Sequence, residues 1–408
     1  IIRWKGVNKM KILTVNAGSS SLKFNCIELP SEKELISGYF ERIGMDASFY
    51  SIKINGTKTK KEAELKNHTD AVNFLKDELI NNGIVSSLDE IDGVGHRLVH
   101  GGDKFKDSVL LTEEVIKECE KFNELAPLHN PAMIMCIRAF ESAMKDTPMV
   151  GVFDTSFHQS IPEINYLYSV PYSWYKDYGV RKYGFHGTSH KFITKTMKEV
   201  LGKESINIIN CHIGSGSSVC CIKDSKSYDT TMGFSPNAGL IMGTRSGDID
   251  YSVIPFIMNK TGKSITEIDN ILNKESGLLG ISEKFADHRD IEHAMFEEHD
   301  KQSILANDMC ANRIIDYIAK YFVELNGKVD ALVFTAGLGE NAREFREQIV
   351  NGLNALGIKI DAEKNMQVAS YCDIHEGVIS STDSSVPVYV IPTNEELMIA
   401  HDTYEIIN

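Results

Sequence analysis

A short apolar segment that breaks into glycine and serine and then resumes occurs twice in this chain, at residues 11–24 and 206–223. The first copy is KILTVNAGSSSLKF and the second is INIINCHIGSGSSVCCIK. Gly and Ser weaken a strand unless the backbone must turn or approach another group closely, so each copy predicts a hairpin with a Gly/Ser tip. Two copies of one plan predict an internally duplicated chain, with one copy in each domain.

The tip of the first hairpin exposes N–H groups, hydroxyls and Lys23, which together suit a phosphate. The simpler alternative is an ordinary turn between two strands, since most Ser/Gly turns have no other role. The segment is not a Walker loop, because GxxxxGK[ST] is absent. A phosphate site at this tip therefore needs support from other parts of the chain.

Size and charge exclude several classes of protein. The chain has 408 residues, which is too long for one ordinary core and predicts two domains, with three as the alternative. With 43 Lys and Arg against 57 Asp and Glu, the net charge of −14 disfavours nucleic acid and anionic membranes as partners. No apolar run is long enough to span a membrane. An anionic ligand would need a local cationic pocket.

The N-terminal residues IIRWKGVNK lack the apolar core of a signal peptide, so we expect a cytoplasmic protein. Met10 fits a natural start, in which case residues 1–9 are a cloning remnant. The eight cysteines show no CxxC spacing. We therefore expect buried reduced thiols rather than disulfides or a metal site.

A third glycine-containing loop lies near the C-terminus. Residues 331–334 predict a strand, residues 337–341 a tight turn and residues 343–356 an amphipathic helix, an order that suits a nucleotide site. Other segments with helical periodicity are 71–81, 113–124, 131–144, 191–201 and 304–325, and strands are expected at 150–153 and 388–391. The pattern predicts an α/β protein, with the domain boundary expected between residues 154 and 171.

Two arginines lie in glycine-containing segments, Arg97 in GHRLVHGG and Arg245 in MGTRSGD. A guanidinium fork binds carboxylate or phosphate bidentately, and flanking glycines allow a close approach. The alternative for each is a surface arginine in a loop.

Candidate carboxylates follow two of the expected strands. Asp154 comes directly after residues 150–153, where it could bind Mg²⁺, orient a substrate or simply cap a helix. In PTNEE, Thr393 and Glu396 match a capping box, which leaves Glu395 available to a metal.

The segment RKYGFHGTSH contains two histidines, but the intervening glycine and the lack of HExxH argue against zinc. His186, flanked by Gly187, is better suited to donate a hydrogen bond to an anion. Most of the other histidines are expected on the surface or in the core.

Taken together, these stretches resemble the acetate kinases. The motifs NAGSSSLKF, GHRLVHGG, PLHNP, FDTSFH, RKYGFHGTSH, HIGSGSS, MGFSPNAGLIMGTRSGDID, GLGEN and PTNEEL occur in the family's order, from Met10 nearly to the C-terminus. The resemblance implies two duplicated actin-like (ribonuclease H-like) domains with an interdomain nucleotide cleft, as in sugar kinases, actin and the heat-shock chaperone ATPase. It implies an N-terminal lobe of residues 1–155 plus 393–408, a nucleotide-binding lobe of residues 156–392, and a homodimer.

The resemblance also implies the reaction ATP + acetate ⇌ ADP + acetyl phosphate by direct in-line transfer with Mg²⁺, or Mn²⁺ as an alternative ion. By matching motif, Asp154 is the catalytic carboxylate, Arg97 and Arg245 hold acetate and the γ-phosphoryl group, and His186 stabilises the transition state. Asn16 and Glu395 belong to the metal site. The pocket for the acetate methyl group is matched by Val99, Leu128, Phe185 and Pro236. The ATP-contacting segments are matched by Lys23, His212, Ile213, Gly214, Ser215, Gly216, Asp287, His288, Arg289, Gly337, Leu338, Gly339, Glu340 and Asn341.

One motif departs from the family. The usual HLGNGSS reads HIGSGSS, so Ser215 stands where Asn is common, and a hydroxyl reaches less far than an amide. A pyrophosphate-dependent acetate kinase therefore stays an alternative, although the intact GLGEN segment favours ATP. A propionate or other short-chain acyl kinase is a second alternative, and a non-enzymatic actin-like ATP-binding module is a third from another class.

Overall fold

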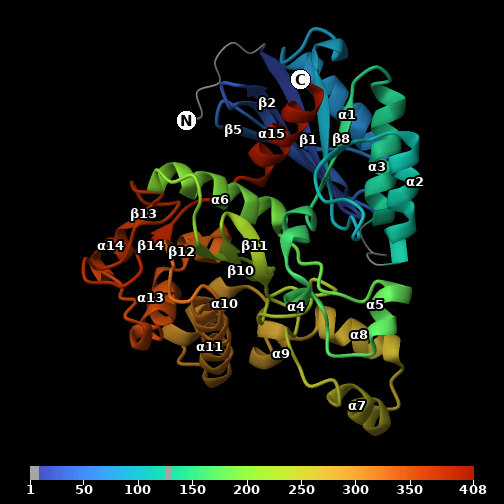
Figure 1. The fold of residues 1–408 in the computed structure, drawn as a ribbon. Helices are drawn as coiled ribbons and strands as arrows, with labels where there is room; N and C mark the ends of the chain where they lie inside the picture. The colour runs from blue at the N-terminus through green and yellow to red at the C-terminus, as the bar shows by residue number, and fades with distance from the viewer. Residues whose placement is uncertain (1–8, 125–129) are drawn as a thin grey trace. The chain divides into compact units, whose positions relative to one another are not determined.

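The computed structural model describes residues 9–124 and 130–408, and Figure 1 shows its ribbon. The chain forms two compact units, one reaching to Phe157 and including Asn394–Asn408, the other comprising His158–Thr393. The C-terminal helix thus belongs to the same unit as the first strands. The assignment of nucleotide binding to one lobe stays a prediction.

The first unit is built on an eight-stranded sheet in the order β5-β4-β3-β2-β1-β6-β8-β7. Its strands are β1 (Met10–Ala17), β2 (Ser21–Leu29), β3 (Lys33–Glu41), β4 (Phe49–Ile54), β5 (Thr57–Glu62), β6 (Gly93–Leu98), β7 (Val109–Leu110) and β8 (Met149–Phe153). β1 and β2 pair antiparallel, with Asn16 opposite Lys23, and this confirms the first expected hairpin. β6 and β8 continue the sheet in parallel.

Helices cover both faces of this sheet. They are α1 (His68–Asn81), α2 (Glu113–Glu120), α3 (Asn130–Ala143) and α15 (Glu395–Ile407), with 3-10 turns at Leu88–Glu90, Lys121–Glu124 and Ser156–Ser160. Along β6, Gly95 faces α15 while the ring of His96 contacts Phe140 of α3 on the opposite face. This alternation is the two-residue period of a strand. The face of β6 that meets α15 therefore also carries Arg97.

The second unit repeats the plan with six strands in the order β11-β10-β9-β12-β14-β13. They are β9 (Ile208–Ile213), β10 (Ser217–Lys223), β11 (Lys226–Thr230), β12 (Ala331–Thr335), β13 (Gly377–Val378) and β14 (Val388–Val390). Three antiparallel strands are followed by two parallel ones, as in β3-β2-β1-β6-β8. The same strand order in both units confirms the duplication and the actin-like fold class.

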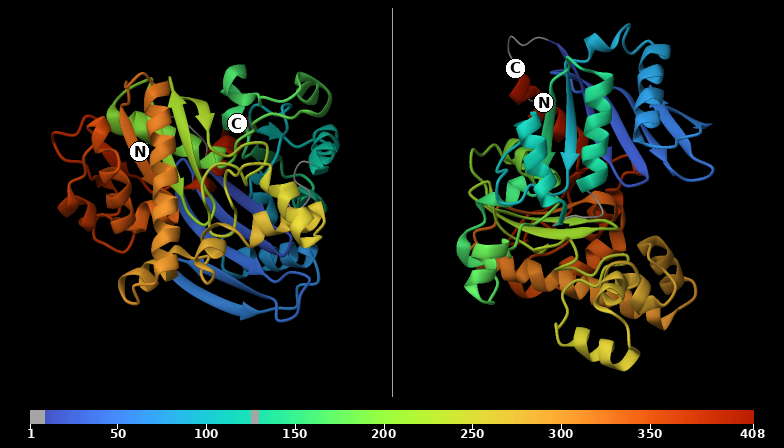
Figure 2. Two further views of the ribbon diagram at one scale, coloured as in Figure 1. Left: turned by 90° about the horizontal axis from the view of Figure 1, so that it is seen from below. Right: turned by 90° about the vertical axis from the view of Figure 1, so that its right-hand side faces the viewer.

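The helices of the second unit are α4 (Glu163–Tyr166), α5 (Tyr172–Tyr178), α6 (Gly187–Leu201), α7 (Val253–Thr261), α8 (Ile265–Lys274), α9 (Gly277–Ser282), α10 (His288–Phe296), α11 (Lys301–Glu324), α12 (Ala336–Asn341), α13 (Arg343–Asn351) and α14 (Ala362–Gln367), with a 3-10 turn at Asn354–Leu356. The long helix α11 packs against one face of β9 and β10 (Figure 2), where Ile209 and Cys211 join the main core. On the other face, Asn210 and His212 meet α6 through hydrogen bonds.

Two local expectations were wrong. Residues 337–341 lie within the short helix α12 rather than in a tight turn, and the helix that begins at Arg343 ends at Asn351, before Gly352. The expectation for the cysteines is confirmed, since all eight are free and seven are buried. In the part of the chain that the structure describes, no helix combines the length and apolar character needed to cross a bilayer.

Candidate active site

Arg97 is the centre of the site in the first unit. It lies near the end of β6, next to β8, whose last residue precedes Asp154. Its Nε and Nη2 donate to the two carboxylate oxygens of Asp154 at 3.0 and 2.5 Å, and its Nη1 donates to Asn16 Oδ1 at 3.2 Å. Burial disfavours the guanidinium charge, but the nearby carboxylates of Asp154 and Glu395 outweigh it and raise the pKa of Arg97. Arg97 therefore stays charged and is fixed in orientation.

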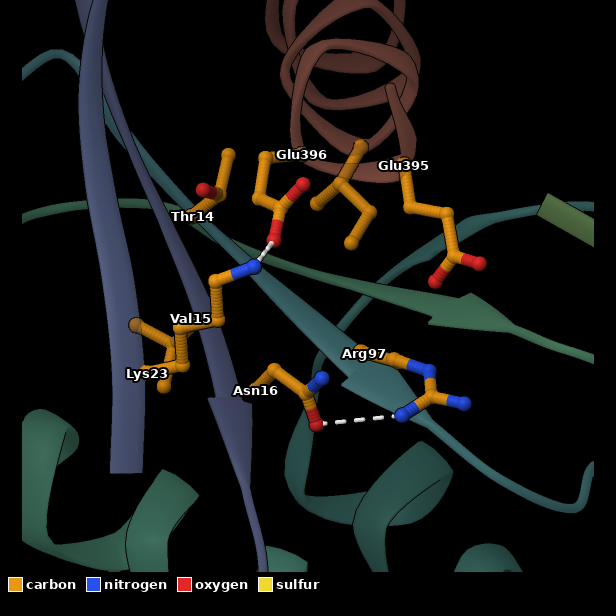
Figure 3. Close-up of a pocket in the computed structure, with 8 residues that line it drawn as sticks. Thr14, Val15, Asn16, Lys23, Arg97, Glu395 and Glu396 are labelled. Atoms are coloured by element: carbon orange, nitrogen blue, oxygen red, sulfur yellow. Dashed lines mark hydrogen bonds and ion pairs between the residues drawn. The ribbon is translucent and has the colours of Figure 1, made fainter. Parts of the chain in front are cut away.

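The N-terminus of α15 is brought over Arg97 by a glycine. A Cβ built on Gly95 would lie 2.6 Å from Ile399 Cγ2 and still closer to Thr403 Oγ1, so only glycine permits this approach. The first residues of the helix, Glu395 and Glu396, then line a small pocket with Arg97 (Figure 3). The other lining residues are Thr14, Val15, Asn16, Lys23 and Ile399.

The expected capping box at this helix was wrong. The N-cap is Asn394, whose side chain accepts from the N–H of Leu397 at 2.9 Å, whereas Thr393 Oγ1 lies 2.8 Å from Ser189 Oγ. Glu396 is instead paired with Lys23 across the pocket. The ion pair places Lys23, an expected phosphate ligand, beside the N-terminus of α15.

Glu395 lies on the same side of the pocket as Arg97, with its carboxylate directed toward the guanidinium in Figure 3. Burial raises its pKa, an effect that Arg97 reduces and that Asp154 and Glu396 increase. The carboxylate thus lies among charged groups in a site of low solvent access.

The oxygens of Asn16 and Glu395 fit a hard cation such as Mg²⁺, which prefers oxygen ligands and keeps several waters. Over residues 9–124 and 130–408, no group of three or more His, Cys, Asp or Glu is arranged to hold a metal ion. A site with one carboxylate and one amide fits an ion that is held partly by water and substrate oxygens.

In the second unit, His186 is held in an uncommon backbone conformation. Its φ of 57° is left-handed, and it serves as the N-cap of α6, next to Gly187. Its Nδ1 lies 2.9 Å from Ser218 Oγ, and its ring stacks on that of His212 with centroids 4.1 Å apart. Such strain in a non-glycine residue persists only where the surrounding structure imposes it, and it clusters at functional sites.

Arg245 lies beside the Gly/Ser loop of β9 and β10. Its Nη1 and His186 Nε2 are both 3.5 Å from the position that a Cβ on Gly216 would occupy. The same Nη1 donates to Pro236 O at 3.2 Å, and its other contact is Met242 Sδ at 3.6 Å. Among the residues with defined positions, Arg245 has no carboxylate partner within 4.0 Å, and burial lowers its pKa. A partly buried cation without a counter-charge favours an anionic ligand.

The Gly/Ser loop closes on itself through Ser217, whose Oγ donates to Gly214 O at 2.9 Å and accepts from Gly214 N at 3.1 Å. Ser215, the residue that departs from the family motif, is exposed at the tip. His212 Nδ1 lies 2.8 Å from Ser189 Oγ, which ties the end of β9 to α6.

The remaining expected nucleotide segments lie on α10 and α12. Asp287 caps α10, and its carboxylate accepts from Arg289 Nε at 3.0 Å and Nη2 at 2.6 Å, which lowers its pKa to about 2. The ring of His288 is buried, with Nε2 3.1 Å from Asn307 Oδ1. In α12, the carboxylate of Glu340 accepts from the N–H of Ala336 at 2.8 Å. These side chains hold their loops in place, and contact with ATP stays a prediction for each.

The expected methyl pocket is described only in part. Val99 is buried in the first unit, and Phe185 is buried in the second. Pro236 contributes its carbonyl to Arg245. Leu128 lies outside the described residues. The pocket as a whole stays a prediction.

Sequence reasoning missed a fully buried arginine beneath α12. Arg346 donates through Nη1 to Gly339 O at 2.9 Å and Glu340 O at 2.7 Å, and through Nη2 to Val368 O at 2.7 Å. The available signal was its position one residue after the core residue Phe345, inside an amphipathic pattern. Sequence reasoning also missed Asn210, His190 and Ser218, which contact His186 directly or through one another.

Comparisons with known proteins agree with the duplicated fold and with these motifs. A model of the acetokinase family matches residues 11–401. An acetate kinase from Bacillus cytotoxicus is 50% identical over 400 residues, which cover 98% of this chain and 99% of that protein. The crystal structure of Porphyromonas gingivalis acetate kinase has a TM-score of 0.92 and 42% identity, covering 98% of this chain and 100% of that one. A propionate kinase from Francisella tularensis has a TM-score of 0.91 and 40% identity, covering 97% and 100%. The chain belongs to the acetokinase family.

Proposed function

We propose that this protein is an acetate kinase, which transfers the γ-phosphoryl group of ATP to acetate and forms acetyl phosphate and ADP reversibly. The observation that carries the proposal is the pair of cationic centres, Arg97 and Arg245, each in the motif expected for it. Their surroundings differ, because Arg97 is fixed by Asp154 whereas Arg245 lacks a carboxylate partner among the described residues.

The chemistry of phosphoryl transfer explains these groups. In a loose in-line transition state, negative charge spreads over the equatorial oxygens, so fixed donors gain strength as that charge develops. Arg245 and His186 are the donors next to the Gly/Ser loop, and Arg97 binds the acetate carboxylate. Asp154, with both oxygens on Arg97, holds that guanidinium in place and is the proposed catalytic carboxylate.

A divalent ion, Mg²⁺ or alternatively Mn²⁺, would be held by Asn16 and Glu395 in the pocket of Figure 3. When bound, it would neutralise charge on the phosphate oxygens. Glu395 is suited to the ion because its carboxylate lies in the pocket. Asn16 is suited to it because its oxygen accepts a single long hydrogen bond, from Arg97 at 3.2 Å, and therefore has a lone pair left for the ion.

Acetate is the proposed acceptor, and propionate is the main alternative, since one of the structural relatives is a propionate kinase. One methylene changes transition-state binding by only about 1–3 kcal/mol, so propionate should react more slowly than acetate but detectably. Butyrate should react least.

A hydroxamate assay with acetate, propionate and butyrate, each with ATP or pyrophosphate as donor, tests the proposal. Acetyl hydroxamate with ATP and a divalent ion is the expected product. Formation only with pyrophosphate would identify the pyrophosphate-dependent alternative, to which the exposed Ser215 would be relevant. No acyl hydroxamate with either donor would reject the kinase assignment and favour a non-enzymatic ATP-binding module.

We further propose a cytoplasmic homodimer. Large apolar side chains are exposed around α4, α5 and the start of α7 in the second unit, including Ile164 at 83%, Tyr178 at 72% and Tyr251 at 79%. Such side chains support an interface with a second copy of the chain. Sedimentation of the wild-type protein and of Tyr251→Glu tests this, and a monomeric wild-type protein would contradict it.

A further inference from the structure

A chain of buried polar side chains ends on His186. It starts at Asn210 on β9, whose Nδ2 lies 2.8 Å from His190 Nδ1 on α6. His190 Nε2 lies 2.9 Å from Ser218 Oγ on β10, and the same oxygen lies 2.9 Å from His186 Nδ1. Asn210, His190 and Ser218 are fully buried, so solvent does not compete for these hydrogen bonds.

The amide of Asn210 determines which atom donates and which accepts in each hydrogen bond of this series. With Nδ2 donating one N–H to His190, the acceptor Oδ1 and the second N–H of the amide are left without a partner among the described residues. Turning the amide would pair Oδ1 but leave both N–H groups without an acceptor, and two unmet donors are the larger loss in a buried site, because the oxygen is a weaker demand than a second N–H. His190 Nδ1 is therefore an acceptor.

The positions of the other protons in the hydrogen-bond series follow from the acceptor role of His190 Nδ1. His190 is neutral, because burial holds its pKa well below the ordinary value, so its one ring proton is on Nε2 and is donated to Ser218 Oγ. The hydroxyl of Ser218 then has one proton to donate, and its other partner is His186 Nδ1. His186 Nδ1 accepts it and carries no proton of its own.

The other nitrogen of His186 faces the Gly/Ser loop. Nε2 lies 3.5 Å from the position of a Cβ on Gly216, as does Nη1 of Arg245. We propose that Asn210, His190 and Ser218 are positioning residues that keep His186 neutral with its proton on Nε2, so that it donates a hydrogen bond to the phosphoryl group. This inference rests on the proposed kinase function and adds to it what fixes the tautomer of His186.

The direction of hydrogen-bond donation, from Asn210 toward His186, matters for the reaction. Phosphoryl oxygens are acceptors and gain negative charge, so they need an N–H group opposite them. If the chain ran the other way, Nδ1 of His186 would hold the proton and Nε2 would present a lone pair to those oxygens. The interaction would then be repulsive.

Nitrogen NMR of the wild-type enzyme tests the tautomer directly. The sample is labelled with ¹⁵N-histidine, and the His186 signals are identified by their loss in His186→Gln. We expect a protonated Nε2 and an unprotonated Nδ1. A protonated Nδ1 with an unprotonated Nε2, in enzyme that forms acetyl hydroxamate, would overturn the inference.

Kinetics test the role of the chain. Ser218→Ala removes the donor to His186 Nδ1, and we expect kcat to fall by about 10- to 100-fold, as for other residues that orient a ligand through a hydrogen bond. The KM values for acetate and ATP should stay within about twofold, because the binding groups remain. The fraction of His186 protonated on Nδ1 should rise in the same sample.

Thr194→Val is the matched control. Like Ser218, Thr194 is buried, but it lies on α6 and its hydroxyl donates to the backbone oxygen of His190 at 2.7 Å rather than to an imidazole. The control should keep the wild-type kcat and tautomer. A folded Ser218→Ala with the kcat of the control would overturn the inference, and if Ser218→Ala fails to fold, the wild-type spectrum decides. Failure of the proposed function is separate, because it would appear as a wild-type protein that forms no acyl hydroxamate.

Discussion

Gly95→Ala probes how the sheet of the first unit positions the residues at the start of α15. The added Cβ would lie 2.6 Å from Ile399 Cγ2, which must retreat by about 0.8 Å to reach the 3.4 Å of ordinary contact. Thr403 Oγ1 on the same helix is closer still. Because two successive turns of α15 are affected, the helix must shift rather than one side chain rotate.

Two consequences follow from that shift. Overpacking of this kind destabilises a protein by about 1–3 kcal/mol. Glu395 and Glu396 begin the same helix, so their carboxylates move relative to Arg97 and Lys23. A displacement near 1 Å in a catalytic site lowers turnover by roughly 100-fold. We therefore expect a folded but weakly active variant.

Gly93→Ala is the matched control on the same strand and face. Its Cβ would meet Ile407 Cδ1 at 2.6 Å, which is the flexible end of a side chain in the last turn of α15, and Thr403 Cγ2 at 3.2 Å, a milder contact than the one that Gly95→Ala makes with the same residue. Urea unfolding gives the stability change, and the hydroxamate assay gives kcat. Wild-type activity in Gly95→Ala, or an equal loss in both variants, would refute this account of how α15 is positioned.

Three further predictions concern the arginines and a buried histidine. Arg97→Ala and Arg245→Ala should each raise the barrier by about 2.7–4 kcal/mol and keep a native circular dichroism spectrum, and near-normal rates in either would remove that residue from the mechanism. Arg346→Met should lower the free energy of unfolding by about 3–5 kcal/mol, since buried carbonyls lose their donor, whereas Arg343→Met should have a smaller effect in the same urea titration. Burial lowers the pKa of His96 to about 3, so between pH 6.5 and pH 3 the unfolded chain binds a proton at this histidine and the folded protein does not. The contribution of His96 to the free energy of unfolding is thus fully present above pH 6.5 and is lost as the pH falls toward 3. His96→Leu should therefore reduce the pH dependence of stability by up to ~1.4 kcal/mol per pH unit, measured in urea titrations at pH 6 and 5.

Local sequence patterns predicted the parts of the fold that depend on neighbouring residues. The two hairpins follow from apolar runs interrupted by Gly and Ser, and their pairing is confirmed in both units. The glycines around Arg97 indicated a close approach, but not its partner: Gly95 contacts a helix that lies 300 residues further along the chain. Sequence spacing carries no information about such a distant contact.

The error at α15 has a similar cause. Thr393 and Glu396 have the spacing of a capping box, yet Asn394 caps the helix because Thr393 is bonded to Ser189 and Glu396 to Lys23. Both partners are distant in sequence. The hydrogen-bond chain from Asn210 to His186 was missed for the same reason: His186, His190 and Ser218 lie in recognised motifs, but no motif shows that these residues contact one another across two strands and a helix.

The surroundings of the two arginines differ, and the difference predicts different roles for them in the proposed reaction. Arg97 has a raised pKa and is held in a bidentate pair with Asp154, so its charge is permanent and its direction is fixed before any ligand binds. Arg245 has a lowered pKa and neutral contacts, so the desolvation of its guanidinium is poorly compensated in the protein alone. A bound anion would compensate it, and the compensation would be greatest when the anion carries the most charge. We therefore expect the interaction of Arg245 to strengthen between ground state and transition state, and we expect Arg97 mainly to position a carboxylate that is charged throughout binding.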